Sequence, residues 1–144
     1  MKIAVLGSGI VGKVLGAGFL KHGHQVMLGT RDPNKQEVRD WLRENPTAAA
    51  GTFDQAAKFG ELVVLATLGR AALEAIDLAG PANLAGKTVM DTTNPIADGP
   101  PVQGAPKVSP QFGGWLRNSA ALAEFRCLSP NCPGQNWLRS VTSR

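Results

Sequence analysis

Three glycines near the amino terminus are spaced as in loops that bind phosphate groups. The stretch GSGIVGKV that begins at Gly7 fits the dinucleotide pattern G-x-G-x-x-G and nearly fits the P-loop pattern G-x-x-x-x-G-K-[ST]. A P-loop needs a hydroxyl after its lysine to hold magnesium, but Val14 follows Lys13. The dinucleotide pattern is complete, since Gly7 can form the tight turn, Gly9 can let the backbone approach a diphosphate, and Gly12 can allow close helix packing. We therefore favour a dinucleotide over a nucleoside triphosphate.

The start of the helix expected after this loop is a candidate anion site. Backbone N–H groups at the first helical residues have no intrahelical partner, and the helix dipole is positive there. The alternative is a tight strand-to-helix turn that binds nothing. The candidate diphosphate-binding residues are Gly7, Ser8, Gly9, Ile10, Val11 and Gly12.

The end of the second expected strand indicates which dinucleotide is bound. NAD-specific sites place an acidic residue there, roughly twenty residues after the last glycine, to accept a hydrogen bond from the ribose. Here the strand ends in Gly29 followed by Thr30 and Arg31, a hydroxyl and a guanidinium that suit a 2′-phosphate. This favours NADP(H), and Lys35 is a further candidate contact. The alternative is that Asp32 turns towards the ribose while the guanidinium is solvated.

Two later strand ends are expected to border the nicotinamide, because ligands of such sheets lie across the carboxyl ends of the strands. The candidates are Thr67 and Leu68 after one strand, and Asn94 and Pro95 after the next. Ordinary turn chemistry is the alternative explanation for each of them. Asp91 is interpreted as a buried strand residue or as a residue that supports the site without touching the ligand. We assign no catalytic side chain and no metal ligand.

Strands alternate with helices along the first two thirds of the chain. The expected strands cover residues 2–6, 25–29, 47–53, 61–67 and 87–93, and the expected helices cover residues 10–22, 32–45, 54–60 and 70–80. This alternation predicts an α/β fold, a Rossmann-type doubly wound parallel sheet in a single domain.

Local signals also predict how these helices begin and which side chains they bury. Asp32 is expected to cap the second helix, with Pro33 in its first turn, and Asp54 is expected to cap the third. The apolar positions at helical spacing are Val11, Val14, Leu15, Phe19 and Leu20 in the first helix, and Leu73, Ile76 and Leu78 in the fourth.

Composition and charge argue against several other functions. The 144 residues are 43% hydrophobic and 18% charged, which is typical of a soluble globular protein. No apolar run is long enough to span a bilayer. The net charge is +4, of which +3 lies after residue 108, so the first 108 residues are nearly neutral and make a poor nucleic-acid surface. Two cysteines, Cys127 and Cys132, are interpreted as free thiols of a cytoplasmic protein.

The character of the sequence changes after residue 108. Residues 1–108 are predicted to form the NADP-binding Rossmann domain, and residues 109–144 an atypical tail with one short helix over 118–125 capped by Asn118. The tail holds one β-branched aliphatic residue, Val141, a poor composition for completing a buried sheet. One hypothesis is that truncation or a reading-frame change produced it.

Three segments together resemble the deazaflavin (coenzyme F-420)-dependent NADP reductase family and its relatives, which include the cytosolic domains of ferric-reductase membrane proteins. They are KIAVLGSGIVGKVLGAGFLKHGHQVMLGTRDP, ELVVLAT and NLAGKTVMDTTNPIADGPP, and they cover about residues 1–105. The part after about Val108 does not resemble the family.

The resemblance implies a Rossmann domain that holds NADP(H) and passes a hydride between it and a flavin or deazaflavin acceptor. It implies that Thr30 and Arg31 bind the 2′-phosphate, and that Thr67, Asn94 and Pro95 border the nicotinamide. It further implies a small-molecule redox acceptor as partner and a homodimer. The cofactors supply the chemistry, so no side-chain acid or base is needed. A dinucleotide-binding module without turnover is the alternative, because the acceptor-binding half is not recognised.

Overall fold

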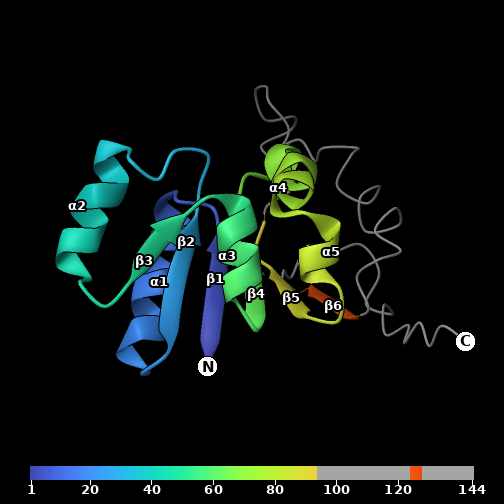
Figure 1. The fold of residues 1–144 in the computed structure, drawn as a ribbon, viewed down its shortest axis with the longest axis horizontal. Coiled ribbons are helices and arrows are strands. Elements are labelled where there is room, and N and C mark those ends of the chain that lie inside the picture. Colours follow the sequence, from blue (N-terminus) through green and yellow to red (C-terminus); the bar gives the residue numbers. More distant parts are fainter. Residues whose placement is uncertain (94–123, 128–144) are drawn as a thin grey trace, which may run out of the picture.

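Parallel strands form one sheet with the first strand near its centre. The computed structural model describes residues 1–93 and 124–127 of the chain. Within them the sheet order is β3-β2-β1-β4-β5-β6, and every neighbouring pair is parallel (Figure 1). The strands are β1 (Lys2–Leu6), β2 (Gln25–Gly29), β3 (Ala49–Gly51), β4 (Leu62–Leu65), β5 (Thr88–Asp91) and β6 (Glu124–Cys127).

Helical crossovers connect the first five strands. The helices are α1 (Ile10–Lys21), α2 (Gln36–Glu44), α3 (Phe53–Phe59), the short 3₁₀ turn η1 (Gly69–Ala71), α4 (Ala72–Ala79) and α5 (Pro81–Leu84). The order 3-2-1-4-5 of the first five strands is that of a Rossmann-type sheet, so the predicted fold class is confirmed. No helix within residues 1–93 is long and apolar enough to cross a membrane.

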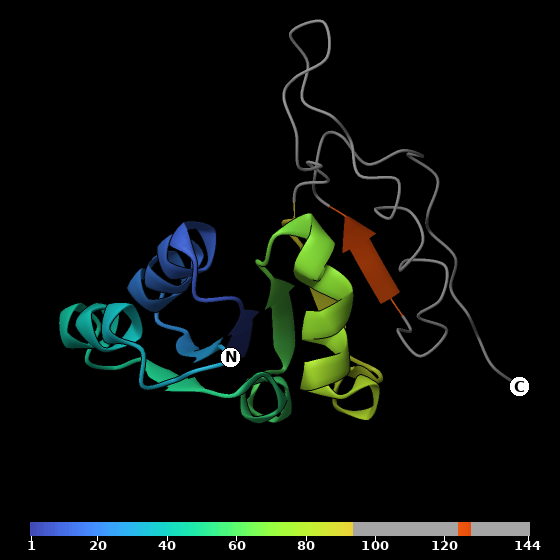
Figure 2. The ribbon, with the colours of Figure 1, turned by 90° about the horizontal axis from the view of Figure 1, so that it is seen from above.

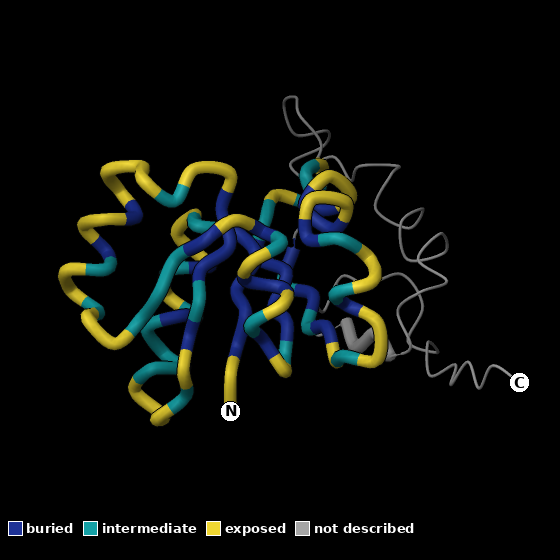
Figure 3. The backbone as a smooth tube through the Cα atoms, viewed as in Figure 1, coloured by how far each residue is buried: buried dark blue, intermediate teal, exposed yellow. Residues whose placement is uncertain are grey.

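The two faces of the sheet are covered by different helices, as a doubly wound fold requires. In Figure 2, α1 and α2 lie on one side of the sheet and α3 lies on the other. The α3 side also receives apolar residues of α4 and α5. Figure 3 shows the central strands buried between these layers, whereas α2 is largely exposed. Aliphatic runs such as β4, whose last three residues are buried, form strands because both of their faces exclude water.

Helix α1 packs through two buried glycines, with three larger apolar residues partly buried against the core beside them (Leu15, Phe19 and Leu20). Gly12 and Gly16 are its buried residues, and a Cβ on Gly16 would lie 3.1 Å from the Trp41 ring of α2. The Trp41 indole N–H donates to the Lys13 carbonyl oxygen at 3.2 Å, which fixes α2 against α1. The prediction that Val11 and Val14 are buried is wrong, because the close approach of α1 on its glycine face leaves both exposed.

Helix α2 begins later than the sequence suggests. Asp32, Pro33, Asn34 and Lys35 form a turn, in which the Lys35 N–H donates to the Asp32 carbonyl oxygen at 3.3 Å. The Asp32 carboxylate accepts from the Asn34 N–H at 2.9 Å, so it stabilises this turn and does not cap the helix. The predicted cap at Asp32 is therefore wrong, and Lys35 occupies the cap position without a side-chain bond.

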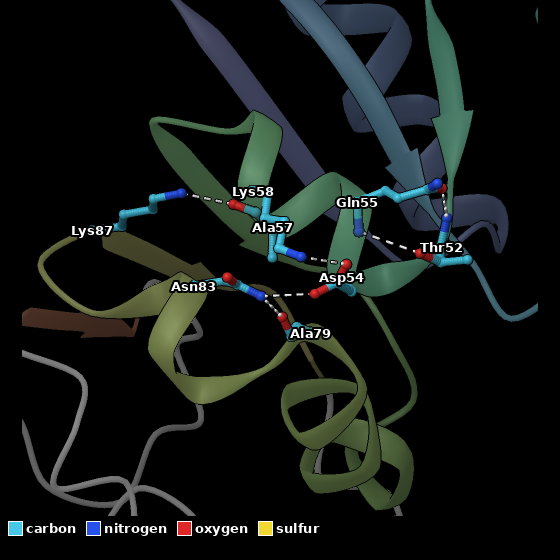
Figure 4. Close-up of polar contacts among 8 residues, drawn as sticks. All are labelled: Thr52, Asp54, Gln55, Ala57, Lys58, Ala79, Asn83 and Lys87. Carbon is cyan, nitrogen blue, oxygen red and sulfur yellow. Dashed lines mark hydrogen bonds and ion pairs between the residues drawn. The ribbon is translucent and has the colours of Figure 1, made fainter.

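Helix α3 has a capping box in which Thr52 takes the role predicted for Asp54. The Gln55 N–H donates to Thr52 Oγ1 at 3.3 Å, and the Thr52 N–H donates to Gln55 Oε1 at 2.9 Å (Figure 4). Asp54 instead accepts from Lys58 at 3.0 Å and from Asn83 of α5 at 3.0 Å, and the hydrogen bond from Lys58 lowers the pKa of its carboxyl. The carboxylate thus connects α3 to α5.

Helix α4 buries small residues where the sequence predicts leucines. Ala72, Ala75, Ile76 and Ala79 face the sheet, and Gly80 ends the helix at φ 77°. Burial of Ile76 is confirmed, but burial of Leu73 and Leu78 is wrong, since each is 46% exposed. The alanine face brings α4 close to the sheet and α3, and this packing decides which side of the helix is covered.

The last described strand lies in the region for which a helix was predicted. Glu124 and Phe125 belong to β6, so the predicted helix over 118–125 is wrong at these two residues. Residues 118–123 lie outside the described part of the chain. Parallel pairing with the open edge of β5, from Thr88 with Glu124 to Asp91 with Cys127, overrides the helical propensity of this segment.

Candidate nucleotide-binding site

The three glycines after β1 are required for different reasons. Gly7 has φ +129°, and a Cβ there would lie 2.4 Å from the Ala66 carbonyl oxygen. A Cβ on Gly12 would lie 2.0 Å from the Gly7 carbonyl oxygen, so the fold itself excludes a side chain at both positions. A Cβ on Gly9 would meet nothing within 4 Å and would project into open space. Packing against the described residues therefore does not explain Gly9, whereas the approach of a ligand would.

The amino end of α1 has the properties of an anion site. Gly9 is its N-cap, no side chain caps the helix, and its first turn contains no acidic residue. Ile10 and Val11 are exposed here, Ile10 by 84%. Unpartnered N–H groups and the positive end of a twelve-residue helix therefore face solvent, an arrangement that favours a diphosphate.

The glycine loop is held against the end of β2. The Gly7 N–H donates to the Gly29 carbonyl oxygen at 2.9 Å, and Ser8 Oγ donates to Thr30 Oγ1 at 3.1 Å. Thr30 is only 6% exposed, and its N–H donates to the Gly51 carbonyl oxygen at 3.0 Å. The candidate diphosphate loop and the candidate 2′-phosphate residues are therefore adjacent, although they are separated in sequence.

Arg31 is ion-paired with a residue that the sequence did not indicate. Its Nε donates to Glu74 Oε1 at 3.2 Å and its Nη2 donates to Glu74 Oε2. Glu74 lies in the first turn of α4, 43 positions away, so no local spacing could have linked the two residues. Lys35, the further candidate contact, pairs with Glu37 at 3.2 Å and is exposed.

The carboxyl ends of β4 and β5 bring together buried polar atoms without partners. Thr67 Oγ1, Asp91 Oδ2 and Thr93 Oγ1 are buried and have no hydrogen-bond partner within the described residues. Asp91 is 0% exposed, which confirms it as a buried strand residue, and burial raises the pKa of its carboxyl. The Thr93 N–H donates to Asp91 Oδ1 at 2.8 Å and partly opposes this shift.

The predicted nicotinamide border is only partly described. Leu68 is 65% exposed just beyond the end of β4, next to Thr67. Asn94 and Pro95 lie outside the described residues. Among the described residues, no group of three or more His, Cys, Asp or Glu side chains could hold a metal ion.

A family model described as NADP oxidoreductase coenzyme F420-dependent matches residues 2–95. That span contains the glycine loop, Thr30, Arg31 and both candidate strand ends. A search of curated protein sequences gives no match.

Solved structures are similar over most of the chain. A protein assigned as an F420-dependent NADP reductase from Arthrobacter sp. FB24 is 34% identical with a TM-score of 0.75, over 85% of this chain and 60% of its own. An imine reductase from Aspergillus terreus, in complex with NADPH4 and dibenz[c,e]azepine, is 21% identical with a TM-score of 0.62, over 88% of this chain and 39% of its own. An imine reductase from Streptomyces aurantiacus is 18% identical with a TM-score of 0.53, over 88% of this chain and 56% of its own. This chain therefore spans less than two thirds of the length of each of these proteins, and the two imine reductases support the fold alone.

Proposed function

The chain belongs to the family of coenzyme F420-dependent NADP oxidoreductases, and from this premise we propose that it transfers a hydride between NADP(H) and a flavin or deazaflavin acceptor. The observation that carries the proposal is the open space at Gly9 beside an uncapped helix. Neighbouring glycines are required by packing, but this one is explained by close approach of a diphosphate.

Binding is divided between two parts of the site. The N–H groups at the start of α1, with Ser8 beside them, would hold the diphosphate. The guanidinium of Arg31, with Thr30, would hold the 2′-phosphate through charge-assisted hydrogen bonds. This division supports NADP(H) rather than NAD(H), because Thr30 and Arg31 follow β2, while the carboxylate of Asp32 accepts from the Asn34 N–H within its own turn.

The chain's role in the reaction is orientation. NADP(H), when bound, supplies or accepts the hydride. Thr67 and Leu68 after β4, and Asn94 and Pro95 after β5, would position the nicotinamide at the carboxyl edge of the sheet. The buried hydroxyl of Thr67 supports this role, because it lacks a partner among the described residues and can hydrogen-bond to a ligand.

A second candidate function is a dinucleotide-binding module without turnover. It is favoured by one observation: the glycine loop and Arg31 belong to the nucleotide half of the site, and no described residue is assigned to an acceptor.

One experiment separates the two functions. Protein, NADPH and FMN or a deazaflavin are mixed anaerobically, and absorbance at the nicotinamide band is followed, with NADPH fluorescence titration as the binding control. We expect saturable binding and NADPH oxidation that depends on the acceptor. Binding without oxidation by any acceptor supports the module, whereas absence of binding refutes both functions.

A further inference from the structure

The guanidinium proposed to bind the 2′-phosphate is already occupied by a carboxylate of the same chain. Arg31 uses two donors, Nε and Nη2, on the two carboxylate oxygens of Glu74. This is the forked arrangement by which arginine also binds phosphate, with one donor on each of two oxygens. Glu74 therefore uses the same donors that a 2′-phosphate would need.

The ion pair lies across the expected position of the adenosine. Arg31 is the second residue after β2, and Glu74 lies in the first turn of α4, after β4. These two strands flank β1, whose carboxyl end carries the glycine loop. The order in which the chain adds strands reverses between β1 and β4. In sheets of this kind, dinucleotides bind outside the carboxyl ends of the strands at such a reversal. The pair thus joins the two sides of the site at its carboxyl edge.

We propose that Glu74 competes with the 2′-phosphate of NADP(H) for Arg31 and thereby lowers the preference of this chain for NADPH over NADH. The inference rests on the proposed function, because it requires the nucleotide to bind at this edge. NADPH binding exchanges one anion on the guanidinium for another, whereas NADH has no 2′-phosphate and leaves the ion pair intact.

Exposure of the pair makes this exchange feasible. The side chains of Arg31 and Glu74 are 62% and 56% exposed, so water and salt screen their attraction. A phosphate monoester carries about −1.5 to −2 charges near neutral pH and is a stronger partner than one carboxylate. The displaced carboxylate stays on α4, close to the new phosphate, and repels it.

The variant Glu74→Gln tests the proposal, because it keeps the side-chain size and removes the charge. We expect the dissociation constant for NADPH to fall roughly threefold to tenfold, as expected for loss of an exposed ion pair and a like-charge contact. The dissociation constant for NADH should change by less than about twofold, because its ribose carries no phosphate to attract or repel. Tryptophan quenching or calorimetry at low salt measures both values.

Two controls assign the effect to the ion pair. Asp77→Asn removes an equal charge from the exposed side of the same helix, and we expect it to leave the NADPH to NADH preference unchanged. In an Arg31→Ala background, Glu74→Gln should lose the part of its effect that comes from releasing the guanidinium, which a double-mutant cycle measures. The probes adenosine 2′,5′-bisphosphate and 5′-AMP repeat the comparison without a nicotinamide.

The outcomes separate this inference from the proposed function. If the unmodified chain binds neither NADPH nor NADH, the proposed function fails and this inference fails with it. If the chain binds NADPH but Glu74→Gln leaves its affinity unchanged, the competition is refuted and the proposed function stands. If Glu74→Gln weakens NADPH binding, Glu74 instead orients Arg31 for the phosphate, which also overturns the competition.

Discussion

At the scale of single residues, the candidate site contains one glycine that packing does not require and one exposed arginine that pairs with a distant residue. Gly9 is a glycine that its surroundings do not require, whereas Gly7 and Gly12 are forced by carbonyl oxygens close to their missing Cβ atoms. Arg31 is an exposed guanidinium whose partner comes from another crossover. These differences allow binding roles and folding roles to be tested separately.

Gly9→Ala should therefore reduce mainly the affinity for NADPH, whereas Gly12→Ala should reduce mainly the stability of the fold. Gly9→Ala leaves the free protein within about 1 kcal/mol of its original stability, because its φ of −74° suits alanine and no atom is near. It should nevertheless weaken NADPH binding by about tenfold or more, because the methyl group blocks the diphosphate and its backbone hydrogen bonds. Gly12→Ala should destabilise the fold by about 1–3 kcal/mol or more through overpacking. Urea unfolding and NADPH titration measure the two effects, and similar stability losses in both variants would contradict the assignment.

Arg31→Ala should weaken NADPH binding by about 1.5 to 3 kcal/mol, as expected for loss of a charge-assisted hydrogen bond. NADH binding should change much less, since no 2′-phosphate is lost. Parallel titrations of both nucleotides measure this difference. Arg43→Ala is the matched control, because Arg43 is an exposed arginine of α2 that pairs with Asp40 and has no assigned role in binding. Equal losses for NADPH and NADH would refute the role assigned to Arg31.

At the scale of elements, the starts of the helices decide what each helix can do. Helix α1 begins without a side-chain cap, whereas α3 begins with the reciprocal bonds of Thr52 and Gln55. Helix α3 is further tied to its surroundings by Asn83, which donates to Asp54, and by Lys87, which donates to the Ala57 carbonyl oxygen at 2.7 Å (Figure 4). Among the described helices a side-chain cap is particular to α3, since α2, α4 and α5 also begin without one. The uncapped start of α1 therefore supports an anion site only together with its glycine loop.

Thr52→Ala should lower the free energy of unfolding by about 1 kcal/mol, within the usual range of about 0.5 to 2 for a lost N-cap. The reason is that the Gln55 N–H loses its acceptor at the start of α3. Chemical denaturation followed by circular dichroism measures the loss. Thr47→Ala changes an exposed threonine outside any helix and serves as the control. A loss no greater than that of the control would show that the capping box contributes little.

At the scale of the whole molecule, the sheet order positions both the candidate site and the buried end of β5. The strand order reverses between β1 and β4, which places the glycine loop, Arg31 and Thr67 along one edge. The same assembly surrounds Asp91, which is fully buried at the end of β5. Neither feature exists in any element taken alone.

The stability of the whole chain should therefore depend on the proton of Asp91. Burial raises the pKa of this carboxyl above its usual value near 4, so the folded state holds a proton that the unfolded state releases. The contribution is fully present below about pH 4 and is lost as pH rises through the folded pKa. Asp91→Asn removes this pH dependence. As pH rises from about 4 to about 7, the free energy of unfolding of the variant should therefore increase relative to that of the unmodified chain, because only the unmodified chain loses the contribution of the Asp91 proton. Urea unfolding across that range measures it, with Asp77→Asn as an exposed control. Stability curves that run parallel for the Asp91 variant and the unmodified chain would show that Asp91 does not titrate as expected.

The sequence by itself determined that five strands alternate with helices along the chain, where the glycine loop lies and the fold class. These depend on local signals, since hydrophobic periodicity and glycine positions act on neighbouring residues. Family membership followed from the same segments. The assigned nucleotide contacts remain predictions, because the described residues show where they lie and not what they bind.

Only the tertiary structure decided which residues meet across the sheet. Asp32 and Asp54 took roles different from those predicted, because several nearby side chains could serve as a cap and the course of the chain selected another. The alanine face of α4 was buried in place of Leu73 because packing distance to the sheet decides which side of a helix is covered. Arg31 and Glu74 met because the fold brings the ends of β2 and β4 to one edge, a contact between distant positions that local patterns do not encode.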